Sequence, residues 1–350
     1  MGVLGAIILF LLIKKFVIKP LEKYFEEQKE LKLAEERAKK YLEEASKQNI
    51  KHTFRPETFD EYIGQRKAKR ILQNYIKAVK ERNKIMPHIL LYGKAGMGKT
   101  TLARIIANEL QVNIVEVITS NIVDIYQIFE YLEQADGGIL FLDEIHAITR
   151  DNAEKLYSLM EDFMYNGRYV KPFTLIGATT EVGEIIRTKR PFYDRFKIII
   201  ELEEYTKEDL IQIAKQYQER VFKEELEEEI YEILANNCRN TPRTLIRLLE
   251  ATNYFDKNIN EVLESFGIIK DGFTYKDLTI LKYIAQNEKG VGLQGLISYL
   301  DTSRDNYLYE IEPFLLKNGC IIRTPRGRKI TQKGLEIIRM LEEKGGDKWN

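Results

Sequence analysis

The stretch Gly93-Lys94-Ala95-Gly96-Met97-Gly98-Lys99-Thr100 has the pattern G-x-x-x-x-G-K-T. It follows the apolar run 89–92 and precedes a helical pattern that starts at Thr101. Between a strand and a helix, this pattern is typical of a phosphate-binding loop, whose glycines let backbone N–H groups face a polyphosphate. The helix N-terminus adds partial positive charge. The sequence therefore predicts a nucleotide site that comprises Gly93, Gly96, Gly98, Lys99, Thr100 and Thr101.

Apolar runs and helical patterns alternate around this loop. The runs lie at 89–92, 114–117, 139–142, 173–178 and 197–202. Such alternation predicts an α/β domain with a parallel sheet and crossover helices. From Thr206 to about Ser265 only helical periodicity is present. From Phe273 onward the order is three helices (277–286, 293–300 and 304–318), a two-strand ribbon (320–330) and a last helix, which is typical of a winged helix-turn-helix.

The run 139–142 ends in the carboxylate pair Asp143 and Glu144. At the end of a buried strand, beyond a phosphate loop, such a pair predicts ATP hydrolysis. Asp143 would hold Mg²⁺ together with Thr100, and Glu144 would polarise the attacking water. His146 completes the letters D-E-I-H, and we interpret it as a packing or interface residue because the three histidines share no metal spacing.

Composition sets limits on the class of protein. The 350 residues are 44% hydrophobic and 31% charged, which predicts a packed globular core. Lys plus Arg equals Asp plus Glu, at 54 each, so any nucleic-acid binding must come from a local basic patch. Cys238 and Cys320 have no C-x-x-C pairing and are predicted to be reduced cysteines of an intracellular chain.

The N-terminus differs from the rest of the chain. An unbroken apolar run from Val3 to Ile13 is followed by Lys14 and Lys15. A helix over 3–18 would rise about 24 Å, short of the ~30 Å hydrocarbon core of a bilayer. We predict a membrane anchor at 1–19 with its lysine-rich flank, and hence the motor, on the cytoplasmic side. An apolar helix for oligomer contact is the alternative. Residues 20–52 are predicted to form a helical linker, because the stretch 21–48 is rich in charge and contains neither Gly nor Pro.

Eight ordered blocks resemble the RuvB family of Holliday-junction branch-migration motors, which are AAA+ ATPases. The resemblance covers about residues 53–338 and implies ATP and Mg²⁺ as cofactors, DNA as a partner, and a homo-oligomeric ring, expected to be a hexamer. The blocks are RPETFDEYIGQ (55–65), the phosphate loop, LFLDEIH (140–146), MEDF (160–163), PFTLIGATT (172–180), DRF (194–196), NTPR (240–243) and RTPRGR (323–328).

The resemblance also implies roles for residues outside the loop. Arg55, Tyr62 and Ile63 would line an adenine pocket, which Tyr205 would close from the side of a helical lid. These assignments are carried over from the matching blocks and not from the spacing of the residues.

Three further residues match family positions that respond to the nucleotide. Thr180 resembles a sensor at a strand tip, where a hydroxyl can contact the γ-phosphate. Arg195 resembles an arginine finger that a neighbouring subunit inserts, so that hydrolysis depends on a ring. Arg243, after Pro242 at a helix start, resembles a lid sensor that couples the nucleotide state to domain rotation.

The two-strand ribbon near the C-terminus carries a local basic patch of the kind that nucleic-acid binding would need in this chain. Arg323, Arg326, Arg328 and Lys329 place four positive charges within seven residues around a Pro-Gly turn. Such a patch suits contact with the phosphate backbone and predicts salt-dependent, non-specific DNA binding. A solvated basic hairpin is the alternative interpretation.

The chain departs from the family at one segment in particular. Between Phe163 and Pro172 it has only MYNGRYVK, where the family carries a longer hairpin that docks on the partner protein RuvA. Asn166-Gly167 suits a tight two-residue turn, so a short hairpin is expected without the apolar tip. The contact with a RuvA-like partner is therefore an open question. Tyr193 and Lys197 also replace an arginine and a glycine of the family pattern.

We predict an AAA+ P-loop domain at 53–204, a helical lid at 205–268, a winged helix at 269–341 and a tail at 342–350. The leading functional hypothesis is an ATP-driven DNA motor of the branch-migration type. Two alternatives are kept: a membrane-tethered AAA+ remodeller or regulator whose winged helix binds protein, and a nucleotide-gated DNA tether.

Overall fold

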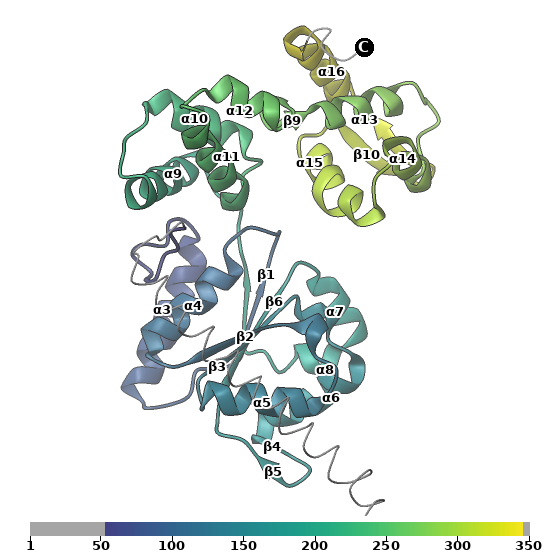
Figure 1. Ribbon diagram of the computed structural model, residues 1–350. Helices are drawn as coiled ribbons and strands as arrows, with labels where there is room; N and C mark the ends of the chain where they lie inside the picture. Colours follow the sequence, from purple (N-terminus) through teal and green to yellow (C-terminus); the bar gives the residue numbers. More distant parts are fainter. Residues whose placement is uncertain (1–52, 346–350) are drawn as a thin grey trace, which may run out of the picture. The chain divides into compact units, whose positions relative to one another are not determined.

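The computed structural model describes residues 53–345 (Figure 1). The predicted anchor at 1–19, the predicted linker at 20–52 and the end of the predicted tail, 346–350, lie outside the described residues. Within 53–345, none of the helices combines the length and the apolar character that crossing a bilayer requires.

A five-stranded sheet forms the centre of the first domain, with the strand order β2-β3-β6-β1-β7 and every pair parallel. Apolar residues fill the inner strands because helices cover both faces of such a sheet, and Leu90, Leu140 and Leu175 are completely buried. All five strands that the apolar runs predict are confirmed. They are β1 (Ile89–Tyr92), β2 (Ile114–Ile118), β3 (Ile139–Asp143), β6 (Thr174–Thr179) and β7 (Ile198–Glu201).

Helices lie on both sides of this sheet, as Figure 1 shows for α3 and α4 on one side and α6, α7 and α8 on the other. Buried side chains of α5 and α6, such as Phe129 and Leu156, join those of the strands in one core. The helices are α3 (Arg66–Glu81), α4 (Lys99–Leu110), α5 (Ile125–Ala135), α6 (Arg150–Asp162), α7 (Val182–Thr188) and α8 (Arg190–Tyr193), with short 3₁₀ turns η2 (Thr119–Asn121) and η3 (Ile145–Ala147).

The expected short hairpin is present as β4 (Met164–Tyr165) and β5 (Arg168–Tyr169). Asn166 and Gly167 have φ values of 49° and 77°, and positive φ at both central residues is the geometry of the tight turns that suit hairpins. Arg168 fixes the hairpin to α5, because its guanidinium lies 4.3 Å from the centre of the Phe129 ring.

A bundle of four helices follows the sheet: α9 (Lys207–Val221), α10 (Glu228–Asn237), α11 (Pro242–Tyr254) and α12 (Ile259–Ser265). The Thr206 side chain begins α9 by accepting a hydrogen bond from the Asp209 N–H at 3.1 Å. This helical segment agrees with the periodicity of the sequence.

The C-terminal domain has the predicted winged-helix order. It contains α13 (Tyr275–Ala285), α14 (Leu293–Leu300), α15 (Glu312–Lys317), the wing strands β10 (Ile321–Thr324) and β11 (Gly327–Ile330), and α16 (Gln332–Gly345). A small hairpin, β8 (Ile268–Lys270) and β9 (Phe273–Thr274), precedes it and was not predicted. Strands of three and two residues are too short to show an alternating pattern.

The single helix expected at 304–318 is instead divided into a π-helical turn, η4 (Asn306–Ile311), and α15. Pro313, near the start of α15, has no N–H to donate to the carbonyl four residues earlier, and its ring would press against that carbonyl. A wider turn before the proline relieves this conflict.

Candidate nucleotide site and wing

The strand order brings three distant segments to one edge of the sheet. Strand β6 lies between β1 and β3, so its C-terminal end separates the phosphate loop that follows β1 from the carboxylate pair at the end of β3. In a parallel sheet, the carboxyl ends of adjacent strands form the edge where ligands bind. The structure therefore places Lys99, Asp143, Glu144 and Thr180 around one site.

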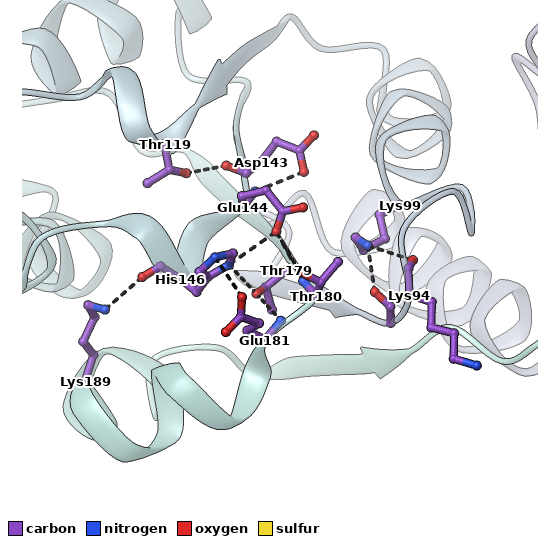
Figure 2. Close-up of polar contacts among 11 residues, drawn as sticks. Lys94, Lys99, Thr119, Asp143, Glu144, His146, Thr179, Thr180, Glu181 and Lys189 are labelled. Carbon is purple, nitrogen blue, oxygen red and sulfur yellow. Dashed lines mark hydrogen bonds and ion pairs between the residues drawn. The ribbon is translucent and has the colours of Figure 1, made fainter. Parts of the chain in front are cut away.

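Lys99 closes the phosphate loop on itself. Its Nζ donates to the carbonyl oxygens of Gly93, at 2.8 Å, and Lys94, at 3.1 Å, and its side chain is buried (Figure 2). Thr100 and Thr101 follow in the first turn of α4 and are half-buried.

Two glycines of the loop have a conformation that other residues rarely adopt. Gly96 and Gly98 have φ values of 76° and 93°. A Cβ on Gly98 would lie 2.5 Å from the hydroxyl oxygen of Tyr62, and one on Gly96 would lie 2.9 Å from the Cβ of Arg243. The loop therefore needs glycine here both for its backbone geometry and for the close approach of its neighbours.

Charges from two domains converge at the loop. Burial lowers the pKa of Lys99, while Glu144 and Asp143 oppose that shift and Arg243 adds to it. Burial also raises the pKa of Asp143, against the effect of Lys99 and Arg243. Arg243 lies in the first turn of α11, so the helical bundle contributes positive charge to this site. Two cations beside glycine-rich backbone N–H groups fit a polyphosphate.

Tyr62 and Tyr205 pack against the loop. Both are buried, and the Tyr205 hydroxyl lies 3.1 Å from the Met97 carbonyl oxygen and 3.3 Å from the Tyr62 hydroxyl. Burial raises the pKa of both phenols. Of the other two residues expected in the adenine pocket, Ile63 is half-buried and Arg55 is exposed, without a polar partner within residues 53–345.

The Glu144 carboxylate is held by the neighbouring strand tip (Figure 2). Its Oε2 accepts hydrogen bonds from the Thr180 hydroxyl at 3.2 Å and from the Thr180 N–H at 3.4 Å. The Glu144 N–H donates to Asp143 Oδ1 at 3.0 Å. The predicted water-activating carboxylate and the predicted sensor are therefore in direct contact.

His146 packs against the Glu144 side of this site. Its Nδ1 lies 3.0 Å from Thr179 Oγ1 and 3.3 Å from Glu144 Oε2. Two further residues of the site carry no sequence prediction. The Thr119 hydroxyl donates to the Asp143 carbonyl oxygen at 2.6 Å, and Glu181 lies beside His146. A single threonine or glutamate carries no chemical pattern, and the only available signal is its position directly after a predicted strand.

Arg195 does not reach the nucleotide loop of its own chain. Its Nη2 pairs with Glu161 Oε2 at 2.9 Å, and its guanidinium lies 5.2 Å from the centre of the Tyr157 ring. Both partners lie on α6, and no other charged partner of Arg195 occurs in the described part of the chain. This position is compatible with a residue that acts on a neighbouring subunit.

In the wing, two of the three arginines expected to contact DNA share one buried carboxylate. Glu312 is completely buried and accepts two hydrogen bonds from Arg323, both 3.0 Å, and two from Arg328, at 2.7 and 3.0 Å. The Arg328 side chain is only 13% exposed, whereas that of Arg323 is 59% exposed. Arg326 is exposed at the turn of the hairpin. The three arginines are therefore not equally available to DNA.

The fold and the site define an AAA+ ATPase. The parallel sheet carries a phosphate loop and, on the next strand but one, an Asp-Glu pair, and it is followed by a helical bundle and a C-terminal winged helix. Two family models match the chain: the Holliday junction DNA helicase RuvB P-loop domain over residues 54–202, and the RuvB C-terminal winged helix domain over 270–339. The chain belongs to the RuvB family.

Individual relatives agree with this assignment. The chain is 34% identical over 319 residues to the Holliday junction branch migration complex subunit RuvB of Mycoplasmopsis pulmonis, covering 83% of this chain and 99% of that protein. It is 36% identical to the protein of the same name from Thermotoga maritima, covering 82% and 92%. The solved structure of the Thermotoga maritima RuvB Holliday junction branch migration motor superimposes with a TM-score of 0.72 at 36% identity, covering 81% of this chain and 98% of that chain.

Proposed function

We propose that this chain hydrolyses ATP and uses the energy to drive branch migration of Holliday junctions. The observation that carries this proposal is the contact between Glu144 and Thr180 beside a phosphate loop, in a chain whose relatives are named branch-migration subunits. The two alternatives, a remodeller with a protein-binding winged helix and a nucleotide-gated DNA tether, have no comparable support among these relatives.

In this function each residue of the site has a separate task. Loop N–H groups and Lys99 bind the phosphates, Tyr62 and Tyr205 support the loop beneath them, and Glu144 accepts a proton from the attacking water. Thr180 donates to the γ-phosphate. Mg²⁺, held by the Thr100 hydroxyl and the Asp143 carboxylate, would neutralise charge on the phosphate oxygens. Both groups are oxygen donors, which suits this cation, and Mg²⁺ usually keeps several waters, so two protein ligands suffice.

The proposal extends to a ring, expected to be a hexamer, in which Arg195 of one subunit completes the site of the next. Arg195 would leave Glu161 and stabilise the charge that develops on the transferred phosphoryl group. Arg243 would report the nucleotide state to the helical bundle, because its side chain packs against Gly96 of the loop and its charge lowers the pKa of Asp143. The boundaries 53–204, 205–268 and 269–341 are proposed for the three domains.

DNA contact is assigned to the wing, chiefly to Arg326 and the exposed part of Arg323. The contact would be to phosphates, since no side chain of this hairpin requires a particular base. A partner of the RuvA type is included in the proposal, because the relatives' name describes a subunit of a complex. The name therefore conflicts with the doubt about a RuvA-like partner that the short hairpin raised. We place the motor in the cytoplasm, and anchoring through residues 1–19 remains a prediction.

A synthetic four-way junction tests this function. We expect the purified chain, with a RuvA-family partner, to convert the junction into two duplex products only when ATP is present. Glu144→Gln should bind the fluorescent nucleotide mant-ATP as the parent does, yet lower the rate of ATP hydrolysis by roughly 10²- to 10⁴-fold. A linear duplex of equal length controls for non-specific stimulation. ATP hydrolysis without any junction conversion, with and without the partner, would argue for one of the two alternatives.

A further inference from the structure

The histidine of the D-E-I-H sequence lies between two carboxylates. Its Nδ1 is 3.3 Å from Glu144 Oε2, and its Nε2 is 3.6 Å from Glu181 Oε1 (Figure 2). A carboxylate oxygen can only accept a hydrogen bond, so each contact is attractive only when the facing ring nitrogen carries a proton. The ring is 20% exposed and its backbone carbonyl accepts from Lys189 Nζ at 2.9 Å, so both ends of the residue are fixed.

The surroundings of the ring determine its orientation. Thr179 Oγ1, on the last residue of β6, lies 3.0 Å from Nδ1 and accepts the Glu181 N–H at 2.9 Å. Thr179 is completely buried, so this anchor is rigid. The imidazole ring therefore links η3, which follows Glu144, to the C-terminal end of β6, which precedes the predicted sensor Thr180.

All contacts to the Glu144 carboxylate fall on one oxygen. Oε2 is contacted by the Thr180 hydroxyl, the Thr180 N–H and His146 Nδ1, whereas Oε1 has no hydrogen bond within residues 53–345. The Thr180 hydroxyl has a single proton and cannot donate it to both Glu144 and a γ-phosphate oxygen. When Thr180 serves the phosphate, its N–H remains on Oε2. The His146 Nδ1–H, shared between Thr179 Oγ1 at 3.0 Å and Oε2 at 3.3 Å, remains beside that oxygen.

We propose that His146 is a positioning residue for ATP hydrolysis: it holds Oε2 of Glu144 so that Oε1 faces the attacking water, and Glu181 sets the orientation of the imidazole. This proposal rests on the proposed ATPase function. It predicts that loss of His146 lowers the rate of the chemical step and leaves nucleotide binding intact, because the ring contacts no residue of the phosphate loop.

The test compares four variants of the full chain in steady-state ATPase assays with junction DNA and in mant-ATP titrations. His146→Ala should lower kcat about 10- to 100-fold, with the Kd for mant-ATP changed less than about twofold, as expected for a misplaced catalytic group. His146→Asn, whose amide N–H can occupy the place of Nδ1, should recover most of the activity. His146→Gln, whose amide reaches toward the place of Nε2, should not. Glu181→Gln should give a smaller loss.

Two controls separate positioning from structure. Glu154→Gln removes an exposed carboxylate that pairs with Arg150 outside the site, and it should leave kcat unchanged. Combining His146→Ala with Glu144→Gln should lower kcat no further than Glu144→Gln alone, because the histidine acts through that carboxylate. Melting temperatures check folding, and if His146→Ala fails to fold, the contrast between the Asn and Gln variants decides.

Unchanged kcat in His146→Ala would overturn the proposal, and so would equal kcat values for the Asn and Gln variants or fully additive losses with Glu144→Gln. Absence of ATP hydrolysis in the parent chain would instead contradict the proposed function. The two failures are therefore distinguishable.

Discussion

Arg326 and Arg328 lie two residues apart on the wing, yet their surroundings differ. Arg326 is exposed at the turn, whereas Arg328 is directed inward, with its guanidinium on Glu312 and 5.7 Å from the centre of the Tyr307 ring. A buried carboxylate is stable only when it is paired and hydrogen-bonded. Arg328 therefore stabilises the domain, and Arg326 is free to contact phosphate.

The first prediction contrasts these two arginines. Arg328→Ala leaves Glu312 with Arg323 alone and should lower the free energy of unfolding by about 3 kcal/mol, the lower end of the cost of breaking a buried pair. Arg326→Ala should change stability by less than about 0.5 kcal/mol. It should instead reduce the salt dependence of DNA binding by about one phosphate contact. Urea unfolding and duplex titrations at several salt concentrations measure both. Equal destabilisation by the two variants would contradict the assignment.

The second prediction concerns pH. Burial alone would raise the pKa of Glu312, but hydrogen bonds from Arg328 and Arg323 lower it below its usual value. Its pKa in the unfolded chain is about 4.3. As pH falls, the unfolded chain therefore binds the proton first. The stabilisation that ionised Glu312 gains from its two arginines is complete above the unfolded-state pKa. It is lost as pH falls through the lower folded-state pKa of Glu312.

Thermal unfolding of the parent and Glu312→Gln over a pH series measures this effect. The gap in melting temperature should be constant near neutral pH and should narrow in acid below about pH 4. A gap that stays constant down to pH 3 would show that the Glu312 charge does not contribute.

At the scale of elements, the sequence predicts a strand correctly where the apolar run is long. The central strands β1, β3 and β6 are buried on both faces, and all five strands of the parallel sheet appear in the sequence as apolar runs. The hairpin β8–β9 has no such run. The π turn η4 precedes Pro313, and apolar periodicity predicts a helix there but not a change of helix type. The Asn166-Gly167 turn was predictable because positive φ at two successive residues strongly favours those residue types.

The third prediction concerns Gly98, the residue of the phosphate loop that directly precedes α4. Gly98→Ala introduces a Cβ at positive φ and 2.5 Å from the Tyr62 hydroxyl oxygen, so the loop or the tyrosine must move. We expect mant-ATP affinity to fall by roughly tenfold or more, equivalent to about 1.4 kcal/mol. Gly183→Ala is the matched control, because a Cβ there meets nothing within 4 Å. Unchanged affinity in Gly98→Ala would show that the loop tolerates a side chain there.

At the scale of the whole molecule, one chain does not contain every group that the proposed chemistry needs. Arg195 is bound to α6 of its own chain and not to its own nucleotide loop. In the proposed ring, the arginine of one subunit would lie beside the nucleotide of the next. ATP hydrolysis would then be a property of the assembly.

The fourth prediction follows from this division. Arg195→Ala subunits and Lys99→Ala subunits should each be nearly inactive in ATP hydrolysis. A mixture should regain part of the activity, because an intact loop can meet an intact arginine across a mixed interface. Junction-stimulated ATPase measured over a series of mixing ratios provides the readout. Activity that stays at the level of the single variants at every ratio would argue that the sites are not shared.

The sequence by itself determined that the chain binds a nucleotide and which strands form its sheet, because a phosphate loop and a doubly buried strand depend on adjacent residues. Only the tertiary structure decided which distant residues meet. The pairing of β3 with β6, in which Leu142 lies opposite Gly177, brings Thr180 and His146 to Glu144. The folding of the wing onto α15 similarly buries Arg328 and leaves Arg326 exposed. Such contacts depend on strand register and on packing between elements, which no local pattern of residues encodes.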